Sequence, residues 1–402
     1  HSNLLLTAQY LAEPLDRAFA RHRAFGATMP TPRPDPIRSP DPDRPLRVGI
    51  LSADLCDHSV AYFVQSLLST RPQGCCLIAI STGPAQPGDV VQTRLRELFQ
   101  EWHEACQLPD ETLHAMLQRL QLDALIELSG HSAGNRLPAL VYKPAPVMIT
   151  AIGYPNTTGV PAVDWRVVDS ITDPPGSEHL CTERLLRLDP CFLCYTPPAQ
   201  APEPALPPAD APFTFGSFNN ANKISVQTAE TWGGLMKAVP NARLLLKSAG
   251  LADRVTRGVL LQALAAEGID PMCVETLDLA AGRREHLDAY ARVHVALDTT
   301  PYNGTTTTCE ALWMGVPVVT TLGDRHAARV SASLLQAAGF PEWIAKDEAD
   351  FARVAADLAA DRSRLATLRT SMRERLRGSA LLDGPAHAQR VLAALENLRA
   401  GA

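Results

Sequence analysis

The residues with the clearest chemical character lie between positions 297 and 319. A strand is predicted to end at Asp298, a glycine-containing turn follows, and four threonines, Thr305 to Thr308, open a short helix. Backbone N–H groups and hydroxyls at a helix N-terminus form an anion site that suits a diphosphate. Glu310 falls about one turn further on, where a carboxylate can accept hydrogen bonds from ribose hydroxyls. The alternative is a well-capped helix with threonines in excess of what capping needs.

A lysine and two histidines follow other predicted strands. Lys223 comes just after a strand at 213–218, and His58 and His131 follow strands at 46–52 and 123–128. In parallel sheets the carboxyl ends of the strands carry the ligand site, so all three are candidates for chemistry. An ammonium there neutralises a departing phosphate, and a histidine acts as base or hydrogen-bond donor at neutral pH. The alternatives are a solvated lysine and two structural histidines.

The sequence contains no recognisable metal or nucleotide-hydrolysis motif. It has neither a Gly-x-x-x-x-Gly-Lys-Ser/Thr loop nor a Gly-x-Gly-x-x-Gly turn, so ATP hydrolysis and nicotinamide binding lose support. Asp-x-Asp, the motif that usually binds the metal ion accompanying a sugar nucleotide, occurs only at Asp41 and Asp43 in a proline-rich stretch. The single Cys-x-x-Cys, Cys191 and Cys194, has no second pair to complete a zinc site. We therefore expect no metal site and no cofactor.

Composition narrows the classes of protein further. The 402 residues are 46% hydrophobic and 20% charged, with a formal charge of -6, which is ordinary for a globular chain. A mildly acidic chain without a block of like charge is a poor binder of nucleic acids and membranes. No apolar run approaches the ~18 residues of a membrane span. Nine scattered cysteines fit reduced thiols, so we expect a cytoplasmic protein, and the start at His1 suggests a fragment.

Two proline-rich stretches divide the chain. Seven prolines lie in 30–45 and seven in 197–212, where neither a helix nor a central strand can form. They predict a helical leader at 1–29, a middle domain at 46–196 and a C-terminal domain at 213–402. In the leader, Ser2 is expected to cap one helix and Pro14 to open a second.

Both large domains are predicted to be α/β. Their short, continuously apolar segments alternate with helical patterns, as in parallel sheets covered on both faces. The predicted strands are 46–52, 76–81, 123–128, 147–152 and 166–168 in the middle domain, and 213–218, 243–246, 293–297 and 316–320 in the C-terminal domain. Two doubly wound domains imply a cleft between the carboxyl ends of two sheets.

Together these segments resemble the catalytic region of the O-linked N-acetylglucosamine transferases, over essentially the whole chain. The motifs that carry the resemblance are the strand of Arg47 with His58, the loop Gly153–Gly159, Phe218-Asn-Asn with Lys223, and Asn303-Gly-Thr-Thr-Thr with Glu310 and Trp313. The resemblance implies the GT-B fold, two facing Rossmann-like doubly wound domains, here with a short helical leader. It also implies inverting transfer from UDP-GlcNAc without a metal.

The resemblance also implies roles for single residues. Lys223 matches the family's leaving-group lysine. His58 matches a histidine discussed as catalytic base; the alternative candidates for the base are a relay and a phosphate oxygen of the donor. The matches to the donor-binding residues are Thr306 and Thr307 for the diphosphate and His286 for stacking on uracil. Three further donor-site positions depart from animal members: Asn220 replaces Gln, Thr305 replaces His and Glu310 replaces Asp. The family carries tetratricopeptide repeats upstream, and the leader would be the segment that joins those repeats to this chain.

We therefore expect a glycosyltransferase that moves N-acetylglucosamine from UDP-GlcNAc to Ser/Thr hydroxyls of a protein or peptide acceptor. One alternative is a GT-B enzyme of other specificity, such as a small-molecule transferase or a UDP-GlcNAc epimerase. The other is a non-catalytic module that binds UDP-sugars.

Overall fold

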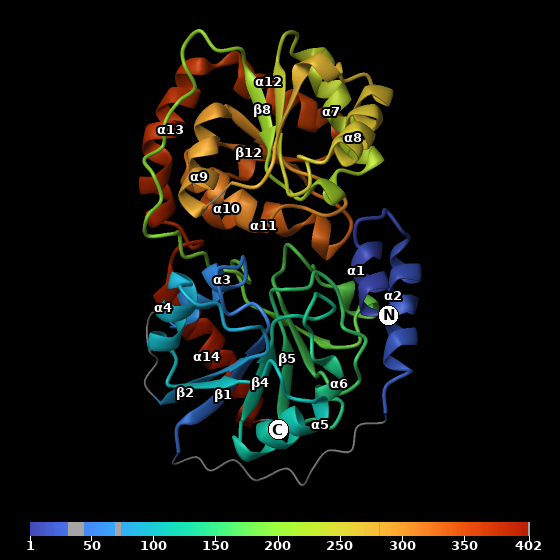
Figure 1. The fold of residues 1–402 in the computed structure, drawn as a ribbon, viewed down its shortest axis with the longest axis vertical. Coiled ribbons are helices and arrows are strands. Elements are labelled where there is room, and N and C mark those ends of the chain that lie inside the picture. The colour runs from blue at the N-terminus through green and yellow to red at the C-terminus, as the bar shows by residue number, and fades with distance from the viewer. Residues whose placement is uncertain (31–43, 69–73, 281, 401–402) are drawn as a thin grey trace. The chain divides into compact units, whose positions relative to one another are not determined.

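The computed structural model describes residues 1–30, 44–68, 74–280 and 282–400, which form two compact units (Figure 1). Unit 1 comprises His1–Thr196 together with Leu382–Ala402, and unit 2 comprises Pro197–Leu381. Most of the predicted linker at 30–45 lies outside the described residues. The second proline-rich stretch, 197–212, belongs to unit 2 and forms no helix or strand. In the described part of the chain, no helix is both long and apolar enough to cross a membrane.

Unit 1 is built on a parallel sheet whose strands, in the described residues, run in the order β3-β2-β1-β4-β5-β6-β7. The strands are β1 (Leu46–Ser52), β2 (Cys75–Ser81), β3 (Glu101–Glu104), β4 (Ala124–Glu127), β5 (Val147–Thr150), β6 (Trp165–Val168) and β7 (Arg184–Arg187). Ile50 of β1 packs in one apolar core and the next residue, Leu51, in another. Both faces of the sheet are therefore covered, which explains the continuous apolar runs in the sequence.

Helices cover the two faces of this sheet. One face packs against α3 (Ala61–Leu68), α4 (Val90–Leu98) and α14 (Gly384–Ala400), and the other against α1 (Ser2–Ala8), α2 (Leu15–Gly26), α5 (Asp110–Arg119) and α6 (Leu137–Leu140). The predicted leader thus forms two helices that contribute Leu5 and Phe25 to the core of unit 1. Ser2 does not cap α1, because His1 is the residue before the helix and the Ser2 hydroxyl bonds elsewhere.

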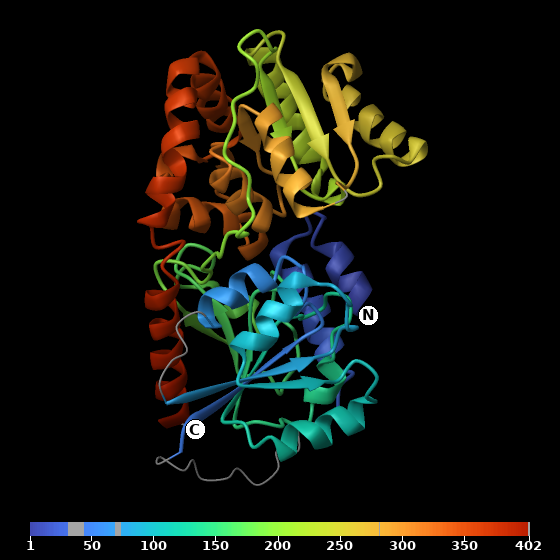
Figure 2. The ribbon, with the colours of Figure 1, turned by 60° about the vertical axis from the view of Figure 1, so that its left-hand side comes forward.

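The last helix corrects one predicted boundary. The sequence assigned 213–402 to the C-terminal domain, but α14 packs against α3, and Leu395 enters the unit 1 core (Figure 2). Unit 2 therefore ends at Leu381. The amphipathic pattern of a helix shows that one of its faces is buried, but not which sheet buries it.

Unit 2 contains a second parallel sheet with the order β10-β9-β8-β11-β12-β13 among the described residues. The strands are β8 (Thr214–Ser217), β9 (Arg243–Lys247), β10 (Val274–Leu277), β11 (Val295–Leu297), β12 (Val318–Thr321) and β13 (Ile344–Ala345). The helices are α7 (Val226–Ala238), α8 (Arg254–Ala266), α9 (Arg283–Asp288), α10 (Thr306–Trp313), α11 (Val330–Ala338), α12 (Glu348–Ala360) and α13 (Arg362–Arg377). Several helices begin where the sequence provides a cap; for example, Ser225 Oγ accepts a hydrogen bond from Thr228 N at the start of α7.

Candidate functional site

The candidate site of unit 2 begins at the carboxyl ends of β8 and β11, which are neighbours in the sheet. Asn219, just after β8, connects the loops that follow the two strands. Its Nδ2 donates to Asp298 Oδ1 and to Thr299 Oγ1, each at 3.1 Å. Its Oδ1 accepts from Thr307 Oγ1 at 2.5 Å. One amide side chain therefore fixes the start of α10 against the end of β8.

Asp298 holds the turn that leads into α10. Its side chain is 6% exposed and accepts hydrogen bonds from Gly304 N and Thr320 Oγ1, both at 2.7 Å. Burial raises the pKa of this carboxyl, and these donors oppose the rise. The turn leaves no room for a side chain at Gly304, because a Cβ would lie 2.6 Å from Thr307 Oγ1 and 2.8 Å from Asn219 Oδ1.

The four threonines differ in what their hydroxyls do. Thr305 precedes α10 and forms no capping bond with its side chain, and Thr306 is buried. Thr307 donates to Asn219, and Thr308 Oγ1 is 2.9 Å from Ser331 Oγ. Two of the four threonines thus serve the structure, which supports part of the alternative reading from sequence. The first turn of α10 carries no acidic residue, so its N-terminus keeps its partial positive charge.

Lys223 lies beside the turn that precedes the threonines. Its Nζ donates to Asn303 O at 2.7 Å and lies 3.9 Å from the centre of the Tyr302 ring. Burial lowers the pKa of Lys223 to about 8, although Asp298 acts in the opposite direction. The structure thus holds this lysine against the turn that leads into α10. Asn220, which precedes it, accepts a hydrogen bond from Asn222 N at 3.0 Å.

A group of charged side chains surrounds Glu310, further along α10. Glu310 is 2% exposed; its Oε1 accepts from Arg283 Nη1 at 2.8 Å, and its Oε2 is 2.9 Å from His286 Nε2. Lys247 Nζ is 2.8 Å from His286 Nδ1. An ammonium only donates, so Nδ1 accepts, and His286 carries its proton on Nε2 and donates it to Glu310. Burial lowers the pKa of Lys247, and Glu310 opposes this shift.

Sequence reasoning missed Lys247 and Arg283. A detectable signal existed for Lys247, because a lysine that ends a continuously apolar strand lies at the carboxyl edge of the sheet. The aromatic rings of Phe218 and Tyr290 complete this part of the site, each centred 6.0 Å from the ring of His286. The structure therefore brings Lys223, Thr307, His286 and Glu310 of the predicted set into one region of unit 2.

In unit 1, His58 follows β1 and is accessible. Its side chain is 48% exposed, and its Nδ1 lies 3.6 Å from Asp54 Oδ2. Burial raises the pKa of the Asp54 carboxyl, and His58 opposes this rise. The position is compatible with proton transfer to or from a ligand, because the ring is both exposed and next to a carboxylate.

His131 is a correction to the sequence analysis, which placed it on a ligand-facing rim. The residue is fully buried, and its Nε2 is 2.8 Å from Thr158 O. Because a carbonyl only accepts, Nε2 carries the proton, and Nδ1 accepts from Ser2 Oγ at 3.0 Å. Burial lowers the pKa of His131 to about 4. Both nitrogens are therefore used to attach α1 to the loop containing Thr158, as in the structural alternative.

No cluster of three or more His, Cys, Asp or Glu side chains suited to a metal ion occurs among the residues that the structure describes. The positive charge of the unit 2 region comes from Lys223, Lys247, Arg283 and the N-terminus of α10. Cations and helix N-termini of this kind bind phosphate groups, so this part of unit 2 is suited to an anion.

Comparison with solved structures identifies proteins that share this fold. A lysine-to-methionine mutant of the Thermobaculum terrenum O-GlcNAc transferase matches with a TM-score of 0.93 and 35% identity, covering 99% of this chain and 77% of that one. Sucrose-phosphate synthase of Thermosynechococcus elongatus matches with a TM-score of 0.55 and 15% identity, covering 89% of this chain and 100% of that one, and shares the fold alone. The two parallel α/β units are those of the GT-B glycosyltransferases.

Sequence comparison gives the family. A relative from Arabidopsis thaliana, named probable UDP-N-acetylglucosamine--peptide N-acetylglucosaminyltransferase SPINDLY, is 37% identical over an alignment of 410 positions that covers 98% of this chain and 44% of the relative. This chain therefore spans less than half the length of this relative and of a second one, named SPINDLY too, from rice. The model of glycosyl transferase family 41 matches residues 34–195 and 205–391. The chain therefore belongs to glycosyl transferase family 41.

Proposed function

We propose that this chain is the catalytic part of an enzyme that transfers N-acetylglucosamine from UDP-GlcNAc to Ser/Thr hydroxyls of proteins. The observation that carries the proposal is the arrangement in unit 2, where Lys223 and the N-terminus of α10 lie at one end of the site and the pair His286–Glu310 lies further along. This order matches a diphosphate followed by a nucleoside. The names of the relatives support the donor and the protein acceptor.

Binding of the donor is assigned to unit 2. The diphosphate would take hydrogen bonds from the first turn of α10, where Thr305 and Thr306 stand, and charge from Lys223. Glu310 would accept from the ribose hydroxyls while it holds His286 in place. His286, with Nε2 bonded to Glu310, would present its ring for stacking on the base. Asn220 and Thr307 would contribute through the loops that they order.

The proposed reaction is a single displacement. The acceptor hydroxyl attacks the anomeric carbon, the bond from that carbon to the diphosphate oxygen breaks, and the configuration inverts. The diphosphate leaves with growing negative charge, which Lys223 and the α10 N-terminus stabilise, so no metal ion is needed. The proton of the hydroxyl passes to His58 or, with His58 orienting the acceptor, to a phosphate oxygen of the donor.

The relatives extend beyond the part matched here, and we propose that tetratricopeptide repeats in the same polypeptide select the acceptor proteins. A cytoplasmic location and the absence of nucleic acid or membrane partners remain predictions from composition. Acceptor identity would then be a property of the longer polypeptide, and the donor specificity a property of unit 2.

The test is transfer of label from a panel of sugar nucleotides to a mixed protein extract. The panel contains UDP-GlcNAc, UDP-GalNAc, UDP-glucose and two GDP-sugars. We expect label on protein from UDP-GlcNAc alone, release of that label by alkaline β-elimination, and a β-anomer in a glycosylated peptide. When Lys223→Met is tested in the same assay, Lys346→Met serves as its control, because it removes the charge of an exposed lysine of the same unit.

Each alternative has its own outcome in this experiment. Label transferred only from another sugar nucleotide would show a transferase of different specificity. Turnover of UDP-GlcNAc without an acceptor would show an epimerase. Binding of UDP with neither transfer nor hydrolysis would show a non-catalytic module. Any of these three results contradicts the proposed function.

A further inference from the structure

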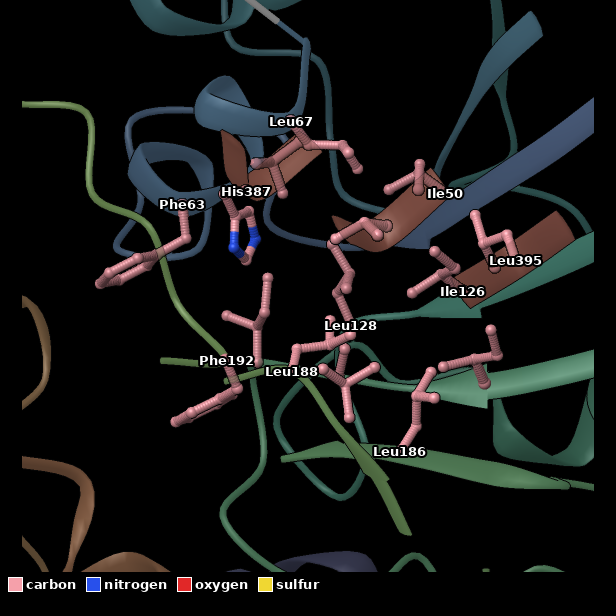
Figure 3. Close-up of a pocket in the computed structure, with 16 residues that line it drawn as sticks. Ile50, Phe63, Leu67, Ile126, Leu128, Leu186, Leu188, Phe192, His387 and Leu395 are labelled. Atoms are coloured by element: carbon pink, nitrogen blue, oxygen red, sulfur yellow. The ribbon is translucent and has the colours of Figure 1, made fainter. Parts of the chain in front are cut away.

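An apolar cavity of about 50 Å³ lies inside unit 1, between the sheet and helices α3 and α14 (Figure 3). Sixteen residues line it, and every one of them except His387 is apolar. Ile50 of β1 and Ile126 of β4 form its floor, and Leu67 and Leu395 come from the two helices. None of the residues that line the cavity is among those to which a role in transfer is assigned.

His387 is the unusual member of this lining. Its side chain is 7% exposed, and its Nδ1 is buried without a hydrogen-bond partner in the described residues. Burial lowers the pKa of His387 to about 4, and Arg390 adds to the effect, so the ring is neutral at physiological pH. Figure 3 shows the ring pointing from α14 into the space between Leu67 and Phe192.

Two unfavourable features therefore coincide at one place: unfilled apolar volume and an unpaired buried nitrogen. A water molecule does not resolve both, because buried waters make about three hydrogen bonds and His387 is the single polar side chain of the lining. A purely apolar molecule fills the volume but leaves the nitrogen unpaired. A charged ligand would find no counter-charge among these side chains.

We propose that this cavity binds a small apolar molecule that carries one hydroxyl, of the class of the short-chain alcohols, with the hydroxyl bonded to His387 Nδ1. A hydroxyl both donates and accepts, so it pairs with this nitrogen whichever tautomer the ring adopts. The alkyl part lies against the isoleucine and leucine side chains of the sheet. This inference is independent of the proposed transferase function.

Occupation of the cavity acts on α14. The ligand contacts both the sheet and α14, so its binding free energy adds to the attachment of the last helix. A ligand that binds the folded state and not the unfolded state raises the unfolding temperature. It also slows hydrogen exchange of the backbone amides of α14.

The first experiment is a titration of the 402-residue chain with the n-alkanols from ethanol to hexanol, by ligand-observed NMR and by thermal unfolding. Each buried methylene contributes about fourfold in affinity until the cavity is full. We expect Kd to fall about fourfold per carbon over the first members and then to level off. Affinity that merely follows partition into octanol through hexanol would overturn the proposal.

The second experiment uses variants. Ala151→Leu adds volume inside the cavity, and Ala115→Leu makes the same change at an exposed position of α5. We expect the first to abolish alkanol binding and the second to leave it unchanged. His387→Leu should lower the affinity for ethanol relative to chloroethane by about fivefold, the usual contribution of one hydrogen bond.

Two results contradict the proposal directly. Equal alkanol binding by wild type and Ala151→Leu would place the ligand elsewhere. An unchanged ratio of the two affinities in His387→Leu would show that the imidazole does not contact the ligand. If His387→Leu does not fold, the comparison of Ala151→Leu with Ala115→Leu decides alone.

Discussion

Replacement of Lys223 by methionine is the sharpest test of the proposed chemistry. The side chain is held by Asn303 O at 2.7 Å and by the Tyr302 ring, so it is already in place before a donor binds. Methionine keeps the unbranched stem and removes the charge. A cation that pairs with the leaving diphosphate acts more strongly on the transition state than on the bound donor.

The size of the effect follows from this geometry. Loss of one preorganised electrostatic contact lowers kcat by about 10²–10³, and the donor KM should change far less. The pKa of about 8 adds a pH signature to the wild type. The charged lysine is the active form, so kcat/KM should fall as pH rises through about 8, to roughly one tenth by pH 9. The kcat/KM of Lys223→Met should not show this decrease above about pH 8.

Steady-state transfer from labelled UDP-GlcNAc, measured between pH 6.5 and 9.5, checks both expectations, with Lys346→Met as the matched control. The stability of Lys223→Met provides a second check. The folded-state pKa of Lys223 lies below the usual value of 10.5, so the unfolded state binds this proton more tightly. Wild-type stability should therefore rise between about pH 8 and 10.5, and the variant should lack that slope. Near-normal kcat with a large rise in KM would refute the role assigned to Lys223.

Three further predictions concern other parts of the molecule. Gly304→Ala should weaken UDP binding at least tenfold and destabilise unit 2 by about 1–3 kcal/mol, because the new Cβ would lie 2.6 Å from Thr307 Oγ1. Calorimetry measures the binding and thermal unfolding measures the stability. Unchanged binding would contradict the close packing of the turn. UDP affinity should be the same with and without EDTA, since Lys223 and the α10 N-terminus supply the positive charge; a large loss on chelation, seen by calorimetry, would show a metal requirement. His131→Phe should lower the unfolding temperature by several degrees, while the kcat of the folded protein stays within about twofold of the wild-type value. A loss of kcat without a loss of stability would instead indicate a catalytic role for His131.

The central strands could be predicted from the sequence, and the edges of the sheets could not. β1 is apolar except for Arg47 and Ser52, and it was predicted with its observed bounds, Leu46–Ser52. The edge strand β3 (Glu101–Glu104) carries charged side chains and is absent from the strands predicted for the middle domain. Edge strands are half-solvated and lack the apolar pattern on which prediction depends.

The candidate site divides in the same way. Lys223 and the threonines could be predicted because strand ends and helix starts are visible in the sequence. The network of Lys247, His286 and Glu310 joins residues 63 positions apart, and hydrogen-bond partners at that separation depend on the tertiary fold. The burial of His131 was missed for a related reason, because the leader helix that covers it lies far away in the chain.

The return of α14 to unit 1 has a consequence for biosynthesis. Unit 1 is begun first, but the helix that closes one face of its sheet leaves the ribosome about 200 residues after Thr196. At 5–20 residues per second this delay is roughly 10–40 s, during which unit 2 can fold and the apolar side chains around Ile50 lack part of their cover. The nascent chain thus needs protection from aggregation for this interval. A chain that terminated before Gly384 would lack α14 and leave that face of the sheet partly uncovered.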